Sequence, residues 1–196
     1  MEQSFIAYIE NSIKQNWDLD ALTDYNGATL QYKDVARKIE KVHLIFEASG
    51  IKKGDKIAIC GRNSSHWGVT FLATLTYGAV VVPILHEFKA DNIHNIVNHS
   101  EAKLLFVGDQ VWENLNEAAM TILEGIILMT DFSILISRTE ILGIFLAEQF
   151  IQVFAGIIQL FRTGYQDGEI RHQDDAFQNG HGGFVQILPY LVAHKQ

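Results

Sequence analysis

A short run of β-branched residues around a proline constrains the fold of this chain most strongly. Three valines, Val80–Val82, precede Pro83 and Ile84, and such a run is typical of a buried strand in a parallel sheet. Two other short apolar runs flank it in the chain, each separated from it by a predicted helix. Strands that alternate with helices form βαβ crossovers and a parallel sheet covered on both faces. The sequence therefore predicts an α/β fold to about residue 136, with strands at Ile57–Cys60, Val80–Pro83 and Leu104–Val107.

Apolar residues at helical spacing place the helices. From Tyr32 to Ser49 they recur every three or four positions, and Gly50 ends the pattern as a left-handed cap. Ser64 or Ser65 can cap the next helix, which stops at Gly78. Two further helices are expected, one from Phe5 to Trp17 and one from Lys89 to His99.

A hairpin is expected between the first helix and Tyr32. Asn26 and Gly27 supply the two positive-φ residues of a type I′ turn, within the segment Tyr25–Leu30.

The chain changes character after Glu140. Ile141–Phe161 is an apolar run interrupted by four polar residues, which fits a buried or interfacial helix better than a membrane span. Gly164–Gly183 lacks periodicity and is expected to be a loop or disordered. We therefore divide the chain into an incomplete α/β domain, 1–140, and a helix with a loop-rich tail, 141–196.

Charge and cysteine content exclude several classes of function. The net charge is −8, so the chain lacks the basic surface that a nucleic-acid backbone requires. Cys60 is the only cysteine, which rules out an intramolecular disulfide, and it is expected to be a small buried hydrophobe. The N-terminus has an acid where a signal peptide has a basic region. The chain is therefore expected in the cytoplasm. The Ile141–Phe161 helix leaves a location at the membrane surface as an alternative.

Five segments in order resemble a known family. They are Leu30–Val35, Lys53–Ile59, Asn63–Trp67, Leu75–Pro83 and Ser100–Lys103. Together they resemble the N-terminal part of the AMP-forming acyl-CoA synthetases, in particular the long-chain fatty acid:CoA ligases, over about residues 21–136. Gln31 departs from the family, which has Thr or Ser there. The resemblance implies a partial doubly wound parallel sheet, in which these motifs serve as scaffold.

The resemblance also implies a chemistry. Members of the family activate a fatty acid with ATP and Mg²⁺ to an acyl-adenylate and then transfer the acyl group to CoA. That reaction needs a Ser/Thr/Gly-rich loop with a lysine to hold the triphosphate, and no segment of these 196 residues has that pattern. We therefore expect the chain to be inactive alone and to bind none of these cofactors, while ATP, Mg²⁺ and CoA belong to the parent family. The acyl chain preference is not determined by this segment.

The sequence assigns no catalytic residue, no metal site and no cofactor-binding residue. His94 and His99 are five apart on a predicted helix, which does not place two ligands on one face. The pair His86–Glu87 follows the predicted strand at the edge where α/β folds bind ligands, although a solvated loop is the simpler interpretation. Three more histidines lie in the unpatterned tail: His172, His181 and His194.

Three functions remain open at this point. The first is an inactive N-terminal piece of an acyl-CoA synthetase. The second is a small α/β module without catalysis that contacts a protein or a membrane surface through Ile141–Phe161. The third, an active small ligase, would need a nucleotide site that no residue here suggests. Exposed apolar surface on an incomplete sheet also predicts self-association through Ile141–Phe161.

Overall fold

The main sheet of the protein has five strands. The computed structural model describes residues 4–138, and its strand order is β4-β3-β5-β6-β7. The predicted strands are confirmed as β3 (Lys56–Cys60), β4 (Val80–Ile84) and β5 (Leu104–Val107), all parallel to one another and to β6 (Gly125–Leu128). The last strand, β7 (Ile134–Ser137), runs antiparallel to β6, which the sequence patterns did not indicate.

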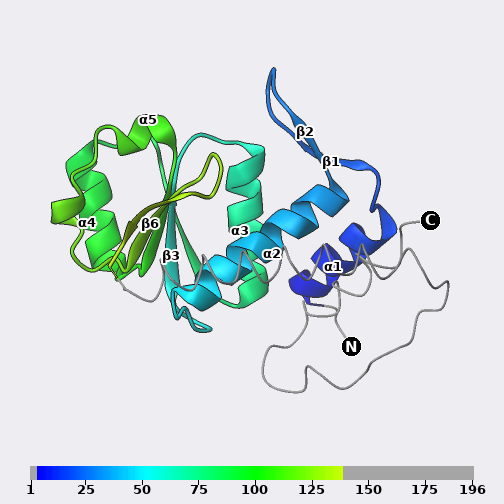
Figure 1. Cartoon of the computed structure of the whole chain (residues 1–196), viewed down its shortest axis with the longest axis horizontal. Helices are drawn as coiled ribbons and strands as arrows, with labels where there is room; N and C mark the ends of the chain where they lie inside the picture. Colours follow the sequence, from blue (N-terminus) through cyan, green and yellow to red (C-terminus); the bar gives the residue numbers. More distant parts are fainter. Residues whose placement is uncertain (1–3, 139–196) are drawn as a thin grey trace, which may run out of the picture.

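Helices cover both faces of this sheet (Figure 1). One face carries α2 (Tyr32–Ala48) and α3 (Ser65–Tyr77), with α1 (Phe5–Gln15) packed alongside. The opposite face carries α4 (Ala90–Ser100), the short α5 (Asp109–Trp112) and a 3-10 turn, η1 (Glu117–Ala119). Alternate side chains of β3, β5 and β6 enter the two resulting cores, as expected for strands buried on both faces.

The expected helix caps are confirmed. The hydroxyl of Ser64 accepts a hydrogen bond from the backbone N–H of Trp67 at 3.1 Å, which begins α3. The backbone of Gly78 has φ +82° and that of Gly50 has φ +68°, so both occupy the left-handed region that glycine adopts without strain. Cys60 is fully buried, as expected, and burial raises the pKa of its thiol to about 11.

The prediction that Val80–Pro83 is buried on both sides is wrong. Strand β4 lies at one edge of the sheet in the described part of the chain. Val80 and Pro83 are exposed and Val81 is half-buried. Pro83 lies inside β4 rather than ending it. Proline has no N–H to donate to a neighbouring strand, and an edge strand tolerates this because it pairs with a neighbour on one side only.

The hairpin is present, but its turn differs from the expected one. Strands β1 (Asp20–Thr23) and β2 (Thr29–Gln31) are antiparallel and joined by residues 24–28. Asn26 has a positive φ of 53°, whereas Gly27 does not. The backbone N–H of Asp24 donates to the oxygen of Ala28, and the N–H of Gly27 donates to the oxygen of Asp24, each at 3.0 Å. The loop therefore has five residues, whereas a type I′ hairpin has two.

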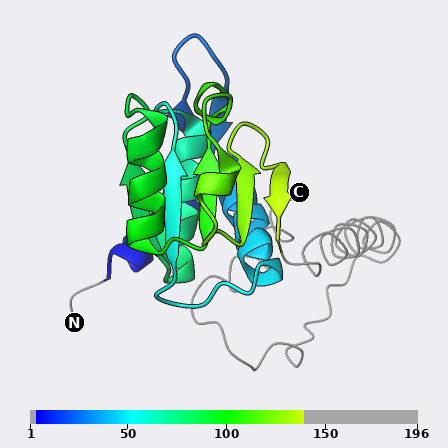
Figure 2. The ribbon, with the colours of Figure 1, turned by 90° about the vertical axis from the view of Figure 1, so that its left-hand side faces the viewer.

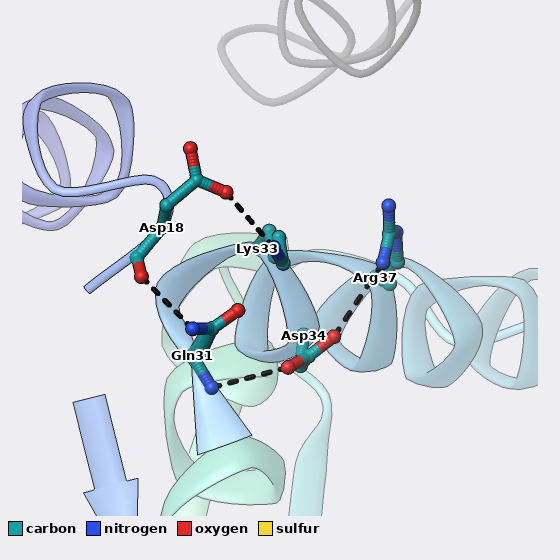
Figure 3. A network of polar contacts seen from close by, with 5 residues as sticks. All are labelled: Asp18, Gln31, Lys33, Asp34 and Arg37. Carbon is teal, nitrogen blue, oxygen red and sulfur yellow. Dashed lines mark hydrogen bonds and ion pairs between the residues drawn. The ribbon is translucent and has the colours of Figure 1, made fainter. Parts of the chain in front are cut away.

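A polar network anchors the start of α2 (Figure 3). The backbone N–H of Gln31 donates to the carboxylate of Asp34 at 3.1 Å, and the side-chain amide of Gln31 donates to the backbone oxygen of Asp18 at 2.9 Å. Lys33 pairs with Asp18 at 2.8 Å and Arg37 with Asp34 at 3.5 Å. Gln31 therefore fills the position of the family's hydroxyl residue with a longer side chain that also ties α2 to the preceding loop.

Replacing Asp34 by alanine is expected to lower the free energy of unfolding by about 1 kcal/mol, because the first turn of α2 loses both a partner for the Gln31 N–H and a favourable negative charge. Urea unfolding followed by circular dichroism measures this change. Asp18→Ala is the matched control in the same network: its side chain is 75% exposed, so the ion pair it loses is worth about 0–1 kcal/mol. An equal or larger loss in Asp18→Ala would contradict the capping role of Asp34.

The predicted helix Ile141–Phe161 and the predicted tail Gly164–Gly183 lie outside the described residues, as does the proposed boundary after Glu140. Within residues 4–138, no helix is both long enough and apolar enough to cross a bilayer.

Candidate functional site

The carboxyl ends of the parallel strands contain a topological switch point. From β3 the chain crosses through α3 to β4 on one side, and from β4 it crosses through α4 to β5 on the other. The two crossover helices therefore leave from opposite faces of the sheet (Figure 1). Open α/β sheets bind ligands in the crevice at this position, because neighbouring loops diverge there.

Two glycines allow the loops to run close together at the switch point. Gly61 follows β3 and Gly108 follows β5, and the N–H of Gly108 donates to the oxygen of Cys60 at 2.9 Å. A Cβ atom on Gly61 would lie 3.3 Å from the Gly108 nitrogen and would collide with the terminal methyl of Met129. A side chain at Gly61 would therefore require the Met129 methyl to move and the Gly108 backbone to shift slightly.

An open cleft of about 970 Å³ occupies this end of the sheet. Its walls come from the hairpin tip, the N-terminus of α3, the β4–α4 loop, α5 and the β6–β7 turn. The hairpin projects beyond the sheet at the end where α5 begins, as both ribbon views show (Figures 1 and 2). The cleft thus brings together segments from residue 24 to residue 130.

His86 and Glu87 lie in this cleft, at the position that their place after β4 predicts. Nδ1 of His86 is 3.2 Å from the Glu87 carboxylate, and the Glu87 side chain is 68% exposed. A ligand-binding role for this pair stays a prediction.

The other histidines do not form a metal site in the described part of the chain. His94 is buried and its Nε2 accepts the backbone N–H of Asn116 at 3.1 Å, so it closes a loop onto α4. Residues 4–138 contain no group of three or more His, Cys, Asp or Glu side chains placed to hold a metal ion. His172, His181 and His194 lie outside the described residues.

The N-terminus of α3 points toward the cleft but already holds a carboxylate. Asp24 accepts the backbone N–H of Ser65 at 2.5 Å and its hydroxyl at 2.9 Å. Helix N-termini favour anions because their first N–H groups lack partners within the helix. The carboxylate of Asp24 therefore fills the place that a phosphate could otherwise take, and it also ties the hairpin to α3.

Replacing Asp24 by alanine is expected to lower the free energy of unfolding by about 1–2 kcal/mol, because the α3 N-terminus loses a charged acceptor. Thermal unfolding of the full chain measures the loss. Asp24→Asn keeps a hydrogen-bond acceptor without the charge and should lose less. A larger loss in Asp24→Asn than in Asp24→Ala would show that the cap does not stabilise the helix as described.

Two cations in the cleft remain without an ion pair among the described residues. Arg62 follows β3 and Lys89 precedes α4, and both line the cleft. Thr130 and Asp109 also line the cleft, and the hydroxyl of Thr130 donates to the carboxylate of Asp109. The same lining also contains the carboxylates of Asp24, Glu87 and Asp109, so these two cations do not make the cleft basic. The neighbouring thiol of Cys60 is buried, and its raised pKa keeps it protonated.

The sequence reasoning missed Asp24, Arg62 and Asp109. Arg62 and Asp109 each lie two residues beyond a strand end, so the rule that singled out His86 also applies to them. Asp24 carried no such signal, because its partner Ser65 is 41 residues away.

Comparison with known proteins assigns the family. The sequence family described as AMP-binding enzyme matches residues 9–138. The putative acyl–CoA ligase YdaB of Bacillus subtilis is 34% identical over 89 residues, which are 45% of this chain and 18% of the relative. Long chain acyl-CoA synthetase 3 of Arabidopsis thaliana is 31% identical over 88 residues, 45% of this chain and 13% of the relative.

A solved structure shares the fold. The long-chain-fatty-acid-CoA ligase FadD1 of Archaeoglobus fulgidus superposes with a TM-score of 0.61 at 19% identity, covering 73% of this chain and 30% of FadD1. The chain thus spans less than a third of the length of each of these proteins. The resemblance seen in the five sequence segments is confirmed, and the family match covers most of the chain: it belongs to the AMP-binding enzyme family.

Proposed function

We propose that residues 9–138 are the scaffold of a fatty acid:CoA ligase of the long-chain type and that the 196-residue chain does not form an acyl-adenylate by itself. The parent reaction would activate a fatty acid carboxylate with ATP and Mg²⁺ and transfer the acyl group to CoA. The observation that carries the proposal is the family match over a segment whose sequence holds no phosphate loop. The printed names of relatives, a long chain acyl-CoA synthetase and a long-chain-fatty-acid-CoA ligase, support the substrate class.

The described residues do not fit a magnesium-bound triphosphate. A triphosphate needs several backbone N–H groups and a lysine from one loop, and Mg²⁺ needs carboxylate or water oxygens around it. In residues 4–138, the helix N-terminus beside the cleft is capped by Asp24, whose charge would repel a phosphate. Arg62 and Lys89 are single cations on separate loops. We therefore derive no catalytic step from this site.

Pyrophosphate exchange driven by a long-chain fatty acid tests this proposal. The purified chain is expected to show no exchange above a blank without enzyme, because the charge-assisted hydrogen bonds that hold the triphosphate are missing. An intact long-chain fatty acid:CoA ligase in the same assay verifies the reagents. Fatty-acid-dependent exchange above the blank would refute the proposed inactivity.

A further inference from the structure

An aromatic side chain, Phe132, packs the β6–β7 turn (residues 129–133) against the core, and its own backbone has a strained conformation. Phe132 has φ +61° and is only 4% exposed. A bulky residue with positive φ is unfavourable, so the surrounding contacts must compensate for it. The ring lies edge-on to Phe106, with centroids 6.3 Å apart, and to His66, with centroids 5.2 Å apart. Phe132 therefore anchors the turn to the core below the cleft.

Two lysines of α2 surround the same ring. The ammonium nitrogens of Lys38 and Lys41 lie 6.0 and 5.8 Å from the centroid of Phe132, within the range of a cation–π interaction. Lys41 also donates to the backbone oxygen of Asp131 at 3.0 Å. The nitrogen of Lys38 is 3.1 Å from Nε2 of His66. Because an ammonium only donates, His66 must offer a lone pair at Nε2, which requires a neutral imidazole.

The turn that these residues hold forms part of the cleft wall. Met129 and Thr130 line the cleft. The N–H of Met129 donates to the oxygen of Val107 at 2.8 Å, and the hydroxyl of Thr130 donates to Asp109. A change in the Phe132 contacts therefore reaches the cleft directly.

We propose that Lys38, His66 and Phe132 form an acid-sensitive latch, which holds the β6–β7 turn against the cleft while His66 is neutral and releases it when His66 binds a proton. This device is independent of the proposed ligase chemistry. Protonation would place a third cation beside Lys38 and Lys41 and would remove the lone pair that Lys38 uses. Release would also relieve the left-handed backbone of Phe132.

The charges around His66 give this latch its direction. Burial and then the charge of Lys38 lower the pKa of His66, and Lys41 adds to the effect, while Asp24 and Asp131 oppose it. These groups come from α2, the hairpin and the turn itself. A group that binds a proton less readily in the closed state favours the open state as pH falls.

Hydrogen exchange of the full chain tests the latch. The amides of Leu128, Met129 and Phe132 are hydrogen-bonded in the closed turn. Between about pH 7.5 and about pH 5.5, their exchange is expected to rise by roughly threefold or more after correction for intrinsic rates. Amides of β5 serve as the internal reference, since global unfolding would raise their exchange equally. No rise in the turn, or an equal rise in β5, would overturn the proposal.

The variant His66→Gln tests whether protonation of His66 causes the acid response of the turn. Its amide oxygen can accept from Lys38 as Nε2 does, yet it does not titrate in this range, so the acid response of the turn should disappear. His86→Gln removes the histidine of the β4–α4 loop and should leave the response intact. The same acid response in His66→Gln as in the unmodified chain would overturn the latch.

A titration of the His66 ring by NMR provides a second measurement if His66→Gln fails to fold. Lys38→Met keeps the side-chain stem and removes the nearest cation, so the pKa of His66 should rise. An unchanged pKa would exclude the coupling between Lys38 and His66.

Discussion

Replacing Leu105 by aspartate is expected to abolish folding of the α/β domain. Leu105 is fully buried in β5, between β3 and β6, where its ladder neighbours are Ala58 and Ile126. A carboxylate in this core would have no partner, and burying an unpaired charge costs several kcal/mol. The whole free energy of unfolding of a domain is about 5–15 kcal/mol. Near-ultraviolet circular dichroism and urea unfolding should show loss of the cooperative transition.

Two variants calibrate this result. Leu105→Ala should keep the fold but lower the free energy of unfolding by about 2–5 kcal/mol through the cavity that it leaves. Val81→Asp places the same charge in the edge strand β4, where the side chain is half-buried and can reach water, so it should destabilise less than Leu105→Asp. A cooperative, near-normal transition in Leu105→Asp would contradict the two-sided burial of β5.

Lowering the pH from about 7.5 to about 5 is expected to remove about 2 kcal/mol from the free energy of unfolding through His43 alone. His43 lies on α2 and its Nε2 is 2.9 Å from the oxygen of Ala73 on α3. Burial lowers the pKa of His43 from 6.5 to about 4, and the hydrogen bond to Ala73 offsets this only in part. Between these two pKa values, His43 is protonated in the unfolded chain but neutral in the folded chain. The free energy of unfolding therefore decreases as the pH falls from about 6.5 to about 4.

Urea unfolding across this pH range, compared with the variant His43→Gln, isolates the effect. Glutamine can donate to Ala73 but does not titrate, so the variant is expected to be less stable near pH 7.5 and to lose less stability on acidification. His66 contributes in the same direction and Glu40, whose pKa burial raises, in the opposite one, so a residual slope should remain. An unchanged slope in His43→Gln would show that His43 does not control the acid response.

Local patterns in the sequence were sufficient to predict three strands of the main sheet and its longer helices, but not β6, β7, α5 or η1. Apolar runs placed β3, β4 and β5 to within a residue or two, and Ser64, Gly50 and Gly78 marked helix ends. Each of these signals depends on residues a few positions apart, through side-chain periodicity or the conformational freedom of glycine. The same reasoning placed His86 and Glu87 at the carboxyl edge, because position after a strand determines the edge of the sheet.

Long-range contacts account for what the sequence patterns did not show. The exposure of β4 depends on which strands lie beside it, and a β-branched run looks the same at an edge as in the middle. The hairpin turn adopted a five-residue loop whose Asp24 caps α3 from 41 residues away.

The amino-acid sequence by itself determined the α/β class, the family resemblance and the absence of a phosphate-loop motif from these 196 residues. The tertiary structure decided which residues share the cleft and how Phe132 is held beside Lys38 and His66. The physical reason is that secondary structure follows from neighbours along the chain. Burial, charge environment and the composition of a site follow from neighbours in space, which only the packing of the whole sheet and its helices brings together.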